Sequence, residues 1–145
     1  VRRPELINEL AAAFGKQCVV VAIDCKLEDG TWWVYLNGGR LKTELNCLVW
    51  AKEAEKRGAG EILLTSMNND GTKAGFALEI TNALASELSI PVIASGGAGS
   101  KEHFKIVFEE AKADAALAAS IFHYGEIPIP ELKAYLSNQG IAIRL

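Results

Sequence analysis

Four short apolar segments, rich in β-branched or small side chains, recur along the chain, and each ends in a polar residue. They are residues 18–24, 61–66, 91–95 and 115–120. Continuous apolar runs of this length are typical of strands that are buried on both faces, as in a parallel sheet. The first run ends with Asp24, so we expect its carboxylate at the carboxyl end of the first strand.

Segments with a helical spacing of apolar residues separate these runs. Pro4 suits the first position of a helix that extends to about Phe14, where Gly15 ends it. The other predicted helices are 45–57 closed by Gly58, 77–88, 101–111 capped by Ser100, and 131–138. Residues 31–43, with Asn37 and Gly38 at their centre, predict a β-hairpin after the first strand.

Alternating strands and helices predict an α/β fold with parallel strands and right-handed crossovers. No linker or low-complexity segment interrupts the chain, so we expect residues 1–145 to form a single domain. Ligands of such folds bind at the carboxyl ends of the strands. One polar residue there can simply terminate a strand, but several on one rim favour a binding site. They are Asp24, Thr65, Ser66, Asp70, Thr72, Ser95 and Ser120.

The strongest local signal is the segment 95–100, Ser-Gly-Gly-Ala-Gly-Ser, directly after the third of these runs. Glycines let the backbone approach a ligand closely, and N–H groups at the start of the next helix face an anion. A tight turn needs only one or two glycines, so three within four residues favour a phosphate site. The spacing fits neither a Walker loop nor the G-x-G-x-x-G motif of a dinucleotide fold.

The end of the next strand, Ala119 and Ser120, offers another N–H group and a hydroxyl. Phosphate held between two consecutive strand-end loops is typical of (β/α)₈ barrels after strands seven and eight. The four strands then number five to eight, and a whole barrel needs about 250 residues. We therefore predict a (β/α)₄ C-terminal half-barrel with a hairpin insertion after its first strand. The chain begins with Val1 rather than Met, which fits a segment of a longer protein.

Two further features on this rim suit chemistry. Asp24 is placed to act as a general acid or base, although a helix cap or a salt bridge to Lys26 would also explain it. The loop that contains Asp70, Gly71 and Thr72 is either a plain turn or a segment that closes over the substrate.

The histidines, cysteines and tryptophans give little evidence about the functional site. We expect His103 to be an exposed residue of a helix and His123 to be structural, although it lies near Ser120. Cys25 is expected to be a packing residue, because no histidine is close in sequence. The pair Trp32 and Trp33 suits either a cover over the site or a partner surface.

The charge and composition of the chain argue against several classes of protein. A net charge of −3 with dispersed Lys and Arg argues against nucleic acid, and no apolar run reaches the ~18–20 residues of a membrane span. The three cysteines show no C-x-x-C spacing, so neither a disulfide framework nor a zinc site is indicated. We expect a cytoplasmic protein without a metal or cofactor.

Taken together, these segments resemble the cyclase subunit of imidazole glycerol phosphate synthase, the barrel enzyme of histidine biosynthesis. The resemblance extends from end to end of the chain and matches the C-terminal half of that family. It rests on residues 14–24, 56–66, 70–73, 93–99, 102–104 and 115–123.

The resemblance implies a reaction and a set of site residues. Ammonia from a glutaminase subunit passes through the barrel and attacks an open-chain ribulosyl formimino-carboxamide ribonucleotide. The products are imidazole glycerol phosphate and aminoimidazole carboxamide ribotide. Of the two catalytic aspartates of this family, Asp24 matches the second, and Glu61 matches a charged gate for ammonia. Substrate phosphate binding is implied for Asp70, Gly71, Ser95, Gly96, Gly97, Ala119 and Ser120, with Thr65 and Thr72 close to the substrate.

The chain lacks the first aspartate and the site for the second substrate phosphate, so we expect it to bind phosphate but to be inactive alone. Two alternatives stay open: a stand-alone flavodoxin-like phosphate-binding module, and the sister isomerase barrel of the same pathway. An isolated half-barrel exposes apolar strand surface and two sheet edges. We therefore expect self-association as a homodimer, or rearrangement to an open sheet covered on both faces.

Overall fold

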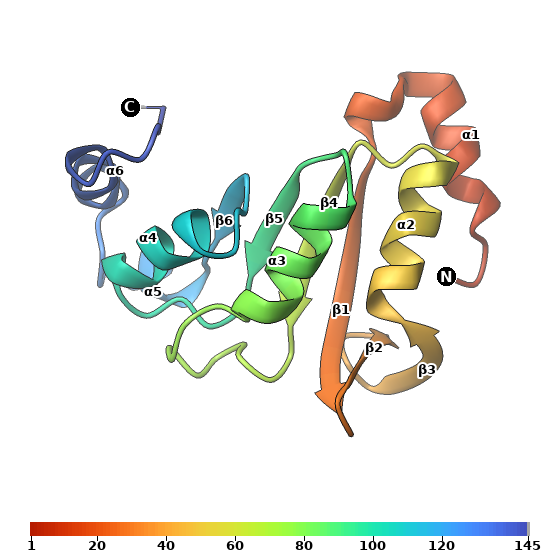
Figure 1. Cartoon of the computed structure of the whole chain (residues 1–145), viewed down its shortest axis with the longest axis horizontal. Helices are drawn as coiled ribbons and strands as arrows, with labels where there is room; N and C mark the ends of the chain where they lie inside the picture. Colours follow the sequence, from red (N-terminus) through yellow and green to blue (C-terminus); the bar gives the residue numbers. More distant parts are fainter. Residues whose placement is uncertain (145) are drawn as a thin grey trace.

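Four parallel strands form the larger part of a six-stranded sheet in the computed structural model, which describes residues 1–144 (Figure 1). The order across the sheet is β3-β2-β1-β4-β5-β6. The parallel strands are β1 (Val20–Glu28), β4 (Glu61–Ser66), β5 (Val92–Ser95) and β6 (Ala115–Leu117). The strands β2 (Thr31–Leu36) and β3 (Leu41–Asn46) add an antiparallel hairpin beside β1.

Helices connect the strands in the order that the α/β pattern predicts. They are α1 (Glu5–Phe14), a short 3-10 helix η1 (Lys16–Cys18), α2 (Cys47–Arg57), α3 (Leu78–Glu87), α4 (Lys101–Glu109), α5 (Ser120–His123) and α6 (Ile129–Asn138). Because successive right-handed crossovers advance in one direction across the sheet, α2, α3 and α4 cover the same face. The α/β fold is confirmed and is consistent with half of a (β/α)₈ barrel, and the barrel is not closed.

The first strand differs from its prediction at both ends. It begins at Val20, because residues 16–18 form η1, and it continues to Glu28. The prediction that Asp24 ends this strand is therefore wrong. After Asp24 the strand pairs antiparallel with β2 through a turn at Asp29 and Gly30, whose φ angles of 51° and 74° suit a two-residue hairpin. The parallel pairing with β4 does end near Asp24, at Cys25 and Ser66.

Other element boundaries also differ from their predictions, most clearly those of the last strand and of helix α2. The last strand ends at Leu117 rather than Ser120, because Ser120 begins the short helix α5. Helix α2 begins at Cys47, because the two preceding residues complete β3 of the hairpin. The Asn46 side chain caps this helix by accepting hydrogen bonds from the N–H groups of Leu48 and Val49, at 3.0 and 3.2 Å.

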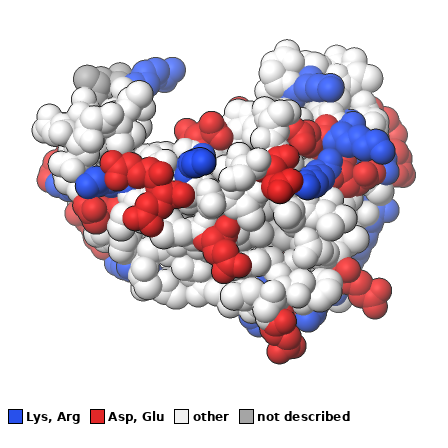
Figure 2. Space-filling view, in the orientation of Figure 1, with Lys and Arg blue, Asp and Glu red and all other residues white. Residues whose placement is uncertain are grey.

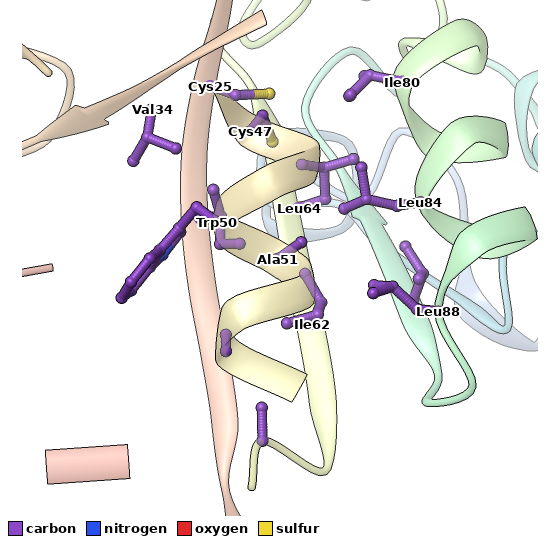
Figure 3. Close-up of a cluster of buried hydrophobic side chains, with 14 of the residues drawn as sticks. Cys25, Val34, Cys47, Trp50, Ala51, Ile62, Leu64, Ile80, Leu84 and Leu88 are labelled. Atoms are coloured by element: carbon purple, nitrogen blue, oxygen red, sulfur yellow. The ribbon is translucent and has the colours of Figure 1, made fainter. Parts of the chain in front are cut away.

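The larger core lies between the helices and one face of the sheet. Burial alternates along β4, where Ile62 and Leu64 are buried while Leu63 and Thr65 are only partly buried. Figure 3 shows Ile62 and Leu64 pointing toward the helices and packing with Leu84 of α3. Each such buried side chain contributes about 1.5–3 kcal/mol to folding. Because this face is filled, the alternate side chains of each strand must lie on the opposite face.

That opposite face, which the crossovers leave uncovered, is apolar at its centre. Ala22, Leu63, Ile93 and Ala115 are register partners across the four parallel strands and share it. At one sheet edge, β2 pairs with β1 only from Asp24 onward, so residues 20–23 have no partner on that side among residues 1–144. The other edge is β6. Among the described residues, the sheet therefore has a bare apolar face and open strand edges at β3, at residues 20–23 of β1 and at β6.

Acidic and basic side chains are interspersed on the face shown in Figure 2. This face therefore has no continuous basic patch of the kind that binds nucleic acid. Among residues 1–144, no helix has the length and apolarity needed to cross a membrane.

The hairpin is held to β1 by a carboxylate with three donors. Glu28 accepts hydrogen bonds from the Lys42 ammonium at 2.6 Å and the Tyr35 hydroxyl at 2.7 Å, and Lys26 lies 2.9 Å away. The hydrogen bonds from Lys42, Lys26 and Tyr35 lower the pKa of Glu28 from 4.5 to about 2. The ionised carboxylate is therefore a structural part of the hairpin.

We expect the hairpin to weaken in acid. A carboxyl group whose pKa is lowered by folding stabilises the fold fully above its unfolded pKa of 4.5. This contribution is lost as the pH falls from about 4.5 through about 2. Urea unfolding as a function of pH should show this loss, and Glu28→Gln should flatten it while lowering stability at neutral pH. Glu44→Gln on β3 is the matched control, and an equal effect of both variants would contradict the role of Glu28.

Candidate functional site

The carboxyl ends of the parallel strands place polar side chains in one row. Asp24 pairs with Thr65, and Thr65 pairs with Ser95, so all three share the uncovered face. Asp24 and Ser95 lie on β1 and β5, with β4 between these two strands. Because neighbouring strands are about 4.8 Å apart, the backbones of the two residues are separated by about twice that distance. Lys26 pairs with Glu28 rather than with Asp24, so the salt bridge considered from the sequence is not formed.

A pocket of about 320 Å³ lies at this rim, over the ends of β4, β5 and β6. It gathers all the predicted phosphate-binding residues together with Thr65. The complete lining is Thr65, Asp70, Gly71, Lys73, Ser95, Gly96, Gly97, Ala98, Leu117, Ala118, Ala119 and Ser120. The structure thus brings together residues from three loops that are far apart in the sequence, and it adds Lys73, which the sequence prediction did not include in the site.

The loop after β4 is shaped by Asn69, a residue that the sequence reasoning missed. Its side-chain oxygen accepts a hydrogen bond from the Ser66 hydroxyl at 2.8 Å, and its amide nitrogen donates to the Gly75 carbonyl at 2.9 Å. The Thr72 hydroxyl donates to the Asn69 carbonyl at 2.6 Å. Thr72 is not among the residues that line the pocket. Its proximity to the substrate stays a prediction.

The glycine segment packs directly on this loop. The Gly75 N–H group donates to the Gly97 carbonyl at 2.8 Å. A Cβ atom at Gly97 would lie 2.1 Å from the Gly75 carbonyl oxygen, and one at Gly99 would lie 2.3 Å from the Lys73 carbonyl oxygen. Close backbone packing therefore requires these glycines even without a ligand. In residues 1–144, the N–H groups of Gly97 and Ala98 donate no backbone hydrogen bond, and both residues line the pocket.

His103 is part of this arrangement, contrary to the expectation of an exposed surface residue. It is half-buried, and its Nδ1 atom accepts a hydrogen bond from the Gly99 N–H group at 3.1 Å. The reason is its place in the first turn of α4, which Ser100 caps by accepting a hydrogen bond from the His103 N–H group at 3.4 Å. The other histidine, His123, is exposed.

The remaining candidates lie away from the pocket. Glu61 is partly buried at the opposite end of β4. Cys25 is fully buried beside Cys47 (Figure 3), and its hydrogen bond with Cys47 and its burial raise the pKa of its thiol. The thiol stays protonated, as its predicted packing role requires. Trp32 packs against the core, and the Lys42 ammonium lies 5.2 Å from the ring centre of Trp33.

Parallel strands with a single helical layer and a pocket at their carboxyl ends are consistent with half of a (β/α) barrel. Residues 1–128 match the family described as histidine biosynthesis protein, and the chain belongs to this family.

Individual relatives carry one common name, imidazole glycerol phosphate synthase subunit HisF. The protein of this name from Bacteroides thetaiotaomicron is 60% identical over 144 residues, which are 99% of this chain and 57% of that protein. The one from Hydrogenobaculum sp. is 56% identical over 146 residues, which are 100% of this chain and 58% of that protein. The chain thus spans a little over half the length of the curated relatives it matches.

We expect Gly97→Ala to loosen the pocket. The residue has a φ angle of 102°, and the new methyl group would meet the Gly75 carbonyl. Gly140→Ala is the matched control, because Gly140 has a φ angle of 82° and a Cβ atom added there would have no neighbouring atom within 4 Å. Both variants carry backbone strain of about 1–3 kcal/mol, but only Gly97→Ala adds the clash.

Urea unfolding should therefore show a larger loss for Gly97→Ala, with faster hydrogen exchange at the Gly75 amide. Equal losses for both variants, with unchanged exchange at Gly75, would contradict the close packing of the two loops.

Proposed function

We propose that this chain is the C-terminal half of the cyclase subunit of imidazole glycerol phosphate synthase. In that role it binds one phosphate group of a substrate that carries a phosphate at each end. The observation that carries the proposal is the similarity to proteins of this name over the whole chain, at 60% identity for the Bacteroides thetaiotaomicron relative. The relatives bear the name of the cyclase subunit rather than of the isomerase, which supports the cyclase over the sister barrel.

The flavodoxin-like alternative is less well supported by the fold. A flavodoxin-like sheet carries helices on both faces. Here the crossover helices cover one face and leave Ala22, Leu63, Ile93 and Ala115 on the other. The same observation argues against rearrangement to a sheet that is covered on both sides. The arrangement instead suits a half-barrel whose bare face becomes the interior of a complete barrel.

Phosphate binding is supported by the chemistry of the pocket wall. Hydroxyl groups come from Thr65, Ser95 and Ser120, and the N–H groups of Gly97 and Ala98 have no backbone acceptor in residues 1–144. Such donors on close-packed, glycine-rich backbone bind phosphate oxygens without reorganisation of the loops.

Asp24 is the catalytic acid or base in this proposal. It lies on the uncovered face in the same row as Thr65 and Ser95, on the side of the pocket where the rest of the substrate must extend. Its carboxylate is partly exposed and outside the ion pairs of residues 1–144, so it is able to exchange a proton with a bound substrate. It assists ring closure after ammonia attacks the ribulosyl formimino-carboxamide ribonucleotide, which gives imidazole glycerol phosphate and aminoimidazole carboxamide ribotide.

Ammonia enters from the opposite end of the barrel in this proposal. Glu61 begins β4 at that end and is partly buried on the uncovered face, as a gate residue for ammonia requires. A glutaminase subunit docks there and supplies the ammonia. The cell compartment is the cytoplasm, which suits the free thiols of Cys25 and Cys47.

We expect the chain to show no turnover alone, because one catalytic aspartate and one phosphate site belong to the other half. Mixing it with the separately produced N-terminal half of the Bacteroides thetaiotaomicron relative should restore turnover with ammonium as nitrogen donor. Asp24→Asn should lower the restored kcat by about 10²–10⁴-fold, since general acid–base catalysis contributes an effect of this size.

The matched control is Asp29→Asn in the β1–β2 turn, which removes the same charge from a residue that does not line the pocket. Retention of phosphate binding by Asp24→Asn would separate catalysis from folding. Steady-state turnover by the chain alone, or full activity of Asp24→Asn in the mixture, would contradict the proposal.

We also propose that the chain self-associates as a homodimer when its other half is absent. Val20 and Leu117 are 50% and 42% exposed on the bare face, and residues 20–23 leave part of a strand edge unpaired. Apolar surface and open edges of this kind favour pairing with a second copy.

Sedimentation equilibrium at micromolar concentration should give a dimer, and Leu117→Lys should shift the equilibrium toward monomer. Val49→Lys on the exposed side of α2 is the control, and a stable monomer of the unmodified chain would refute self-association.

A further inference from the structure

Lys73 is the one basic residue among those that line the pocket in the described chain, and the pocket also contains the Asp70 carboxylate. A phosphate dianion beside a carboxylate needs a cation to offset the repulsion between like charges. The hydroxyl and N–H donors of the wall are neutral. The charge of Lys73 is therefore the main electrostatic attraction that the wall offers to a phosphate group.

In the structure this ammonium is held by a carboxylate from outside the pocket. The Lys73 Nζ atom lies 2.6 and 2.7 Å from the two carboxylate oxygens of Glu126. Lys73 belongs to the loop after β4, and Glu126 follows α5 beyond the end of β6. The ion pair thus spans the glycine segment after β5, which lies between these two strands in the sheet.

The backbone of Lys73 is constrained to this position. Its φ angle is 58°, a left-handed conformation that is uncommon for lysine, and its carbonyl group packs against Gly99. This conformation and the contact with Gly99 hold the Lys73 backbone in place beside the glycine segment. The side chain, in contrast, is about half exposed, as is that of Glu126 (45% and 40%). Exposed ion pairs are weak, so a competing anion can replace the carboxylate.

We propose that Lys73 is the charge partner of the bound phosphate, and that its ion pair with Glu126 is the resting arrangement that phosphate displaces. The ammonium turns from the Glu126 carboxylate to a phosphate oxygen while the Lys73 backbone stays in place against Gly99. Glu126 competes with the ligand and sets its affinity, whereas Lys73 provides the attraction. This inference rests on the proposed function, because it assigns the phosphate to the same pocket.

The test is a titration of the whole chain with inorganic phosphate at neutral pH and constant ionic strength, followed by the amide NMR signals of Gly97 and Ser120. Lys73→Met should weaken phosphate binding by about tenfold, the effect of losing a hydrogen bond from a charged group. Glu126→Gln should strengthen it by about threefold, because it removes the competing carboxylate of an exposed ion pair.

The matched control is Lys101→Met. Lys101 pairs with Glu131 on α6 and does not line the pocket, so this variant removes the same charge from a comparable ion pair. It should bind phosphate within error of the unmodified chain. Thermal unfolding by circular dichroism checks that all variants are folded.

The outcomes separate the two proposals. Phosphate binding by the unmodified chain that is unchanged in Lys73→Met would overturn the assignment of Lys73 and leave the phosphate pocket in place. Weaker binding by Glu126→Gln would overturn the displacement, because the ion pair would then belong to the bound state. No response of Gly97 or Ser120 to phosphate in the unmodified chain would overturn the pocket itself.

Discussion

The register of the parallel strands is the constraint on which the site depends. Pairing of Asp24 with Thr65 and of Thr65 with Ser95 sets one row of side chains on one face, and a shift of one residue would turn every one of them toward the helices. The register is fixed by burial, because Ile23, Leu64 and Ala94 occupy the core face one position earlier along each strand. The apolar core thus determines where the polar rim lies.

The sequence predicted the parts of the fold that follow from hydrophobic periodicity. The strand β4 has the predicted bounds, and α1 differs by a single residue. It did not predict that β1 continues beyond Asp24, because Cys25 to Glu28 mix buried and charged residues and the turn at Asp29 and Gly30 was not recognised. That dipeptide is a hairpin signal, and it was available in the sequence.

Most residues of the pocket could be predicted from the sequence one by one, but the hydrogen bonds that join their loops could not. Asn69 and His103 act through hydrogen bonds to the Gly75 carbonyl and the Gly99 N–H group, and such partners follow only from the arrangement of three loops. The glycines show the limit of a motif most clearly. Their spacing suggested an anion site. The structure shows a separate reason why glycine is needed at Gly97 and Gly99: in each case a backbone carbonyl oxygen occupies the place where a side chain would lie.

The hydrogen bonds of Asn69 have a consequence for the thermodynamics of binding. They fix the loop after β4 against Gly97 through contacts within the protein itself, so the fold orders the backbone N–H groups at the rim. A ligand that enters this pocket does not have to bear the entropy loss of ordering a loop, which otherwise reduces affinity. At the proposed phosphate site, affinity would then be set mainly by charge and desolvation, so we expect inorganic phosphate to need no larger substrate attached to it.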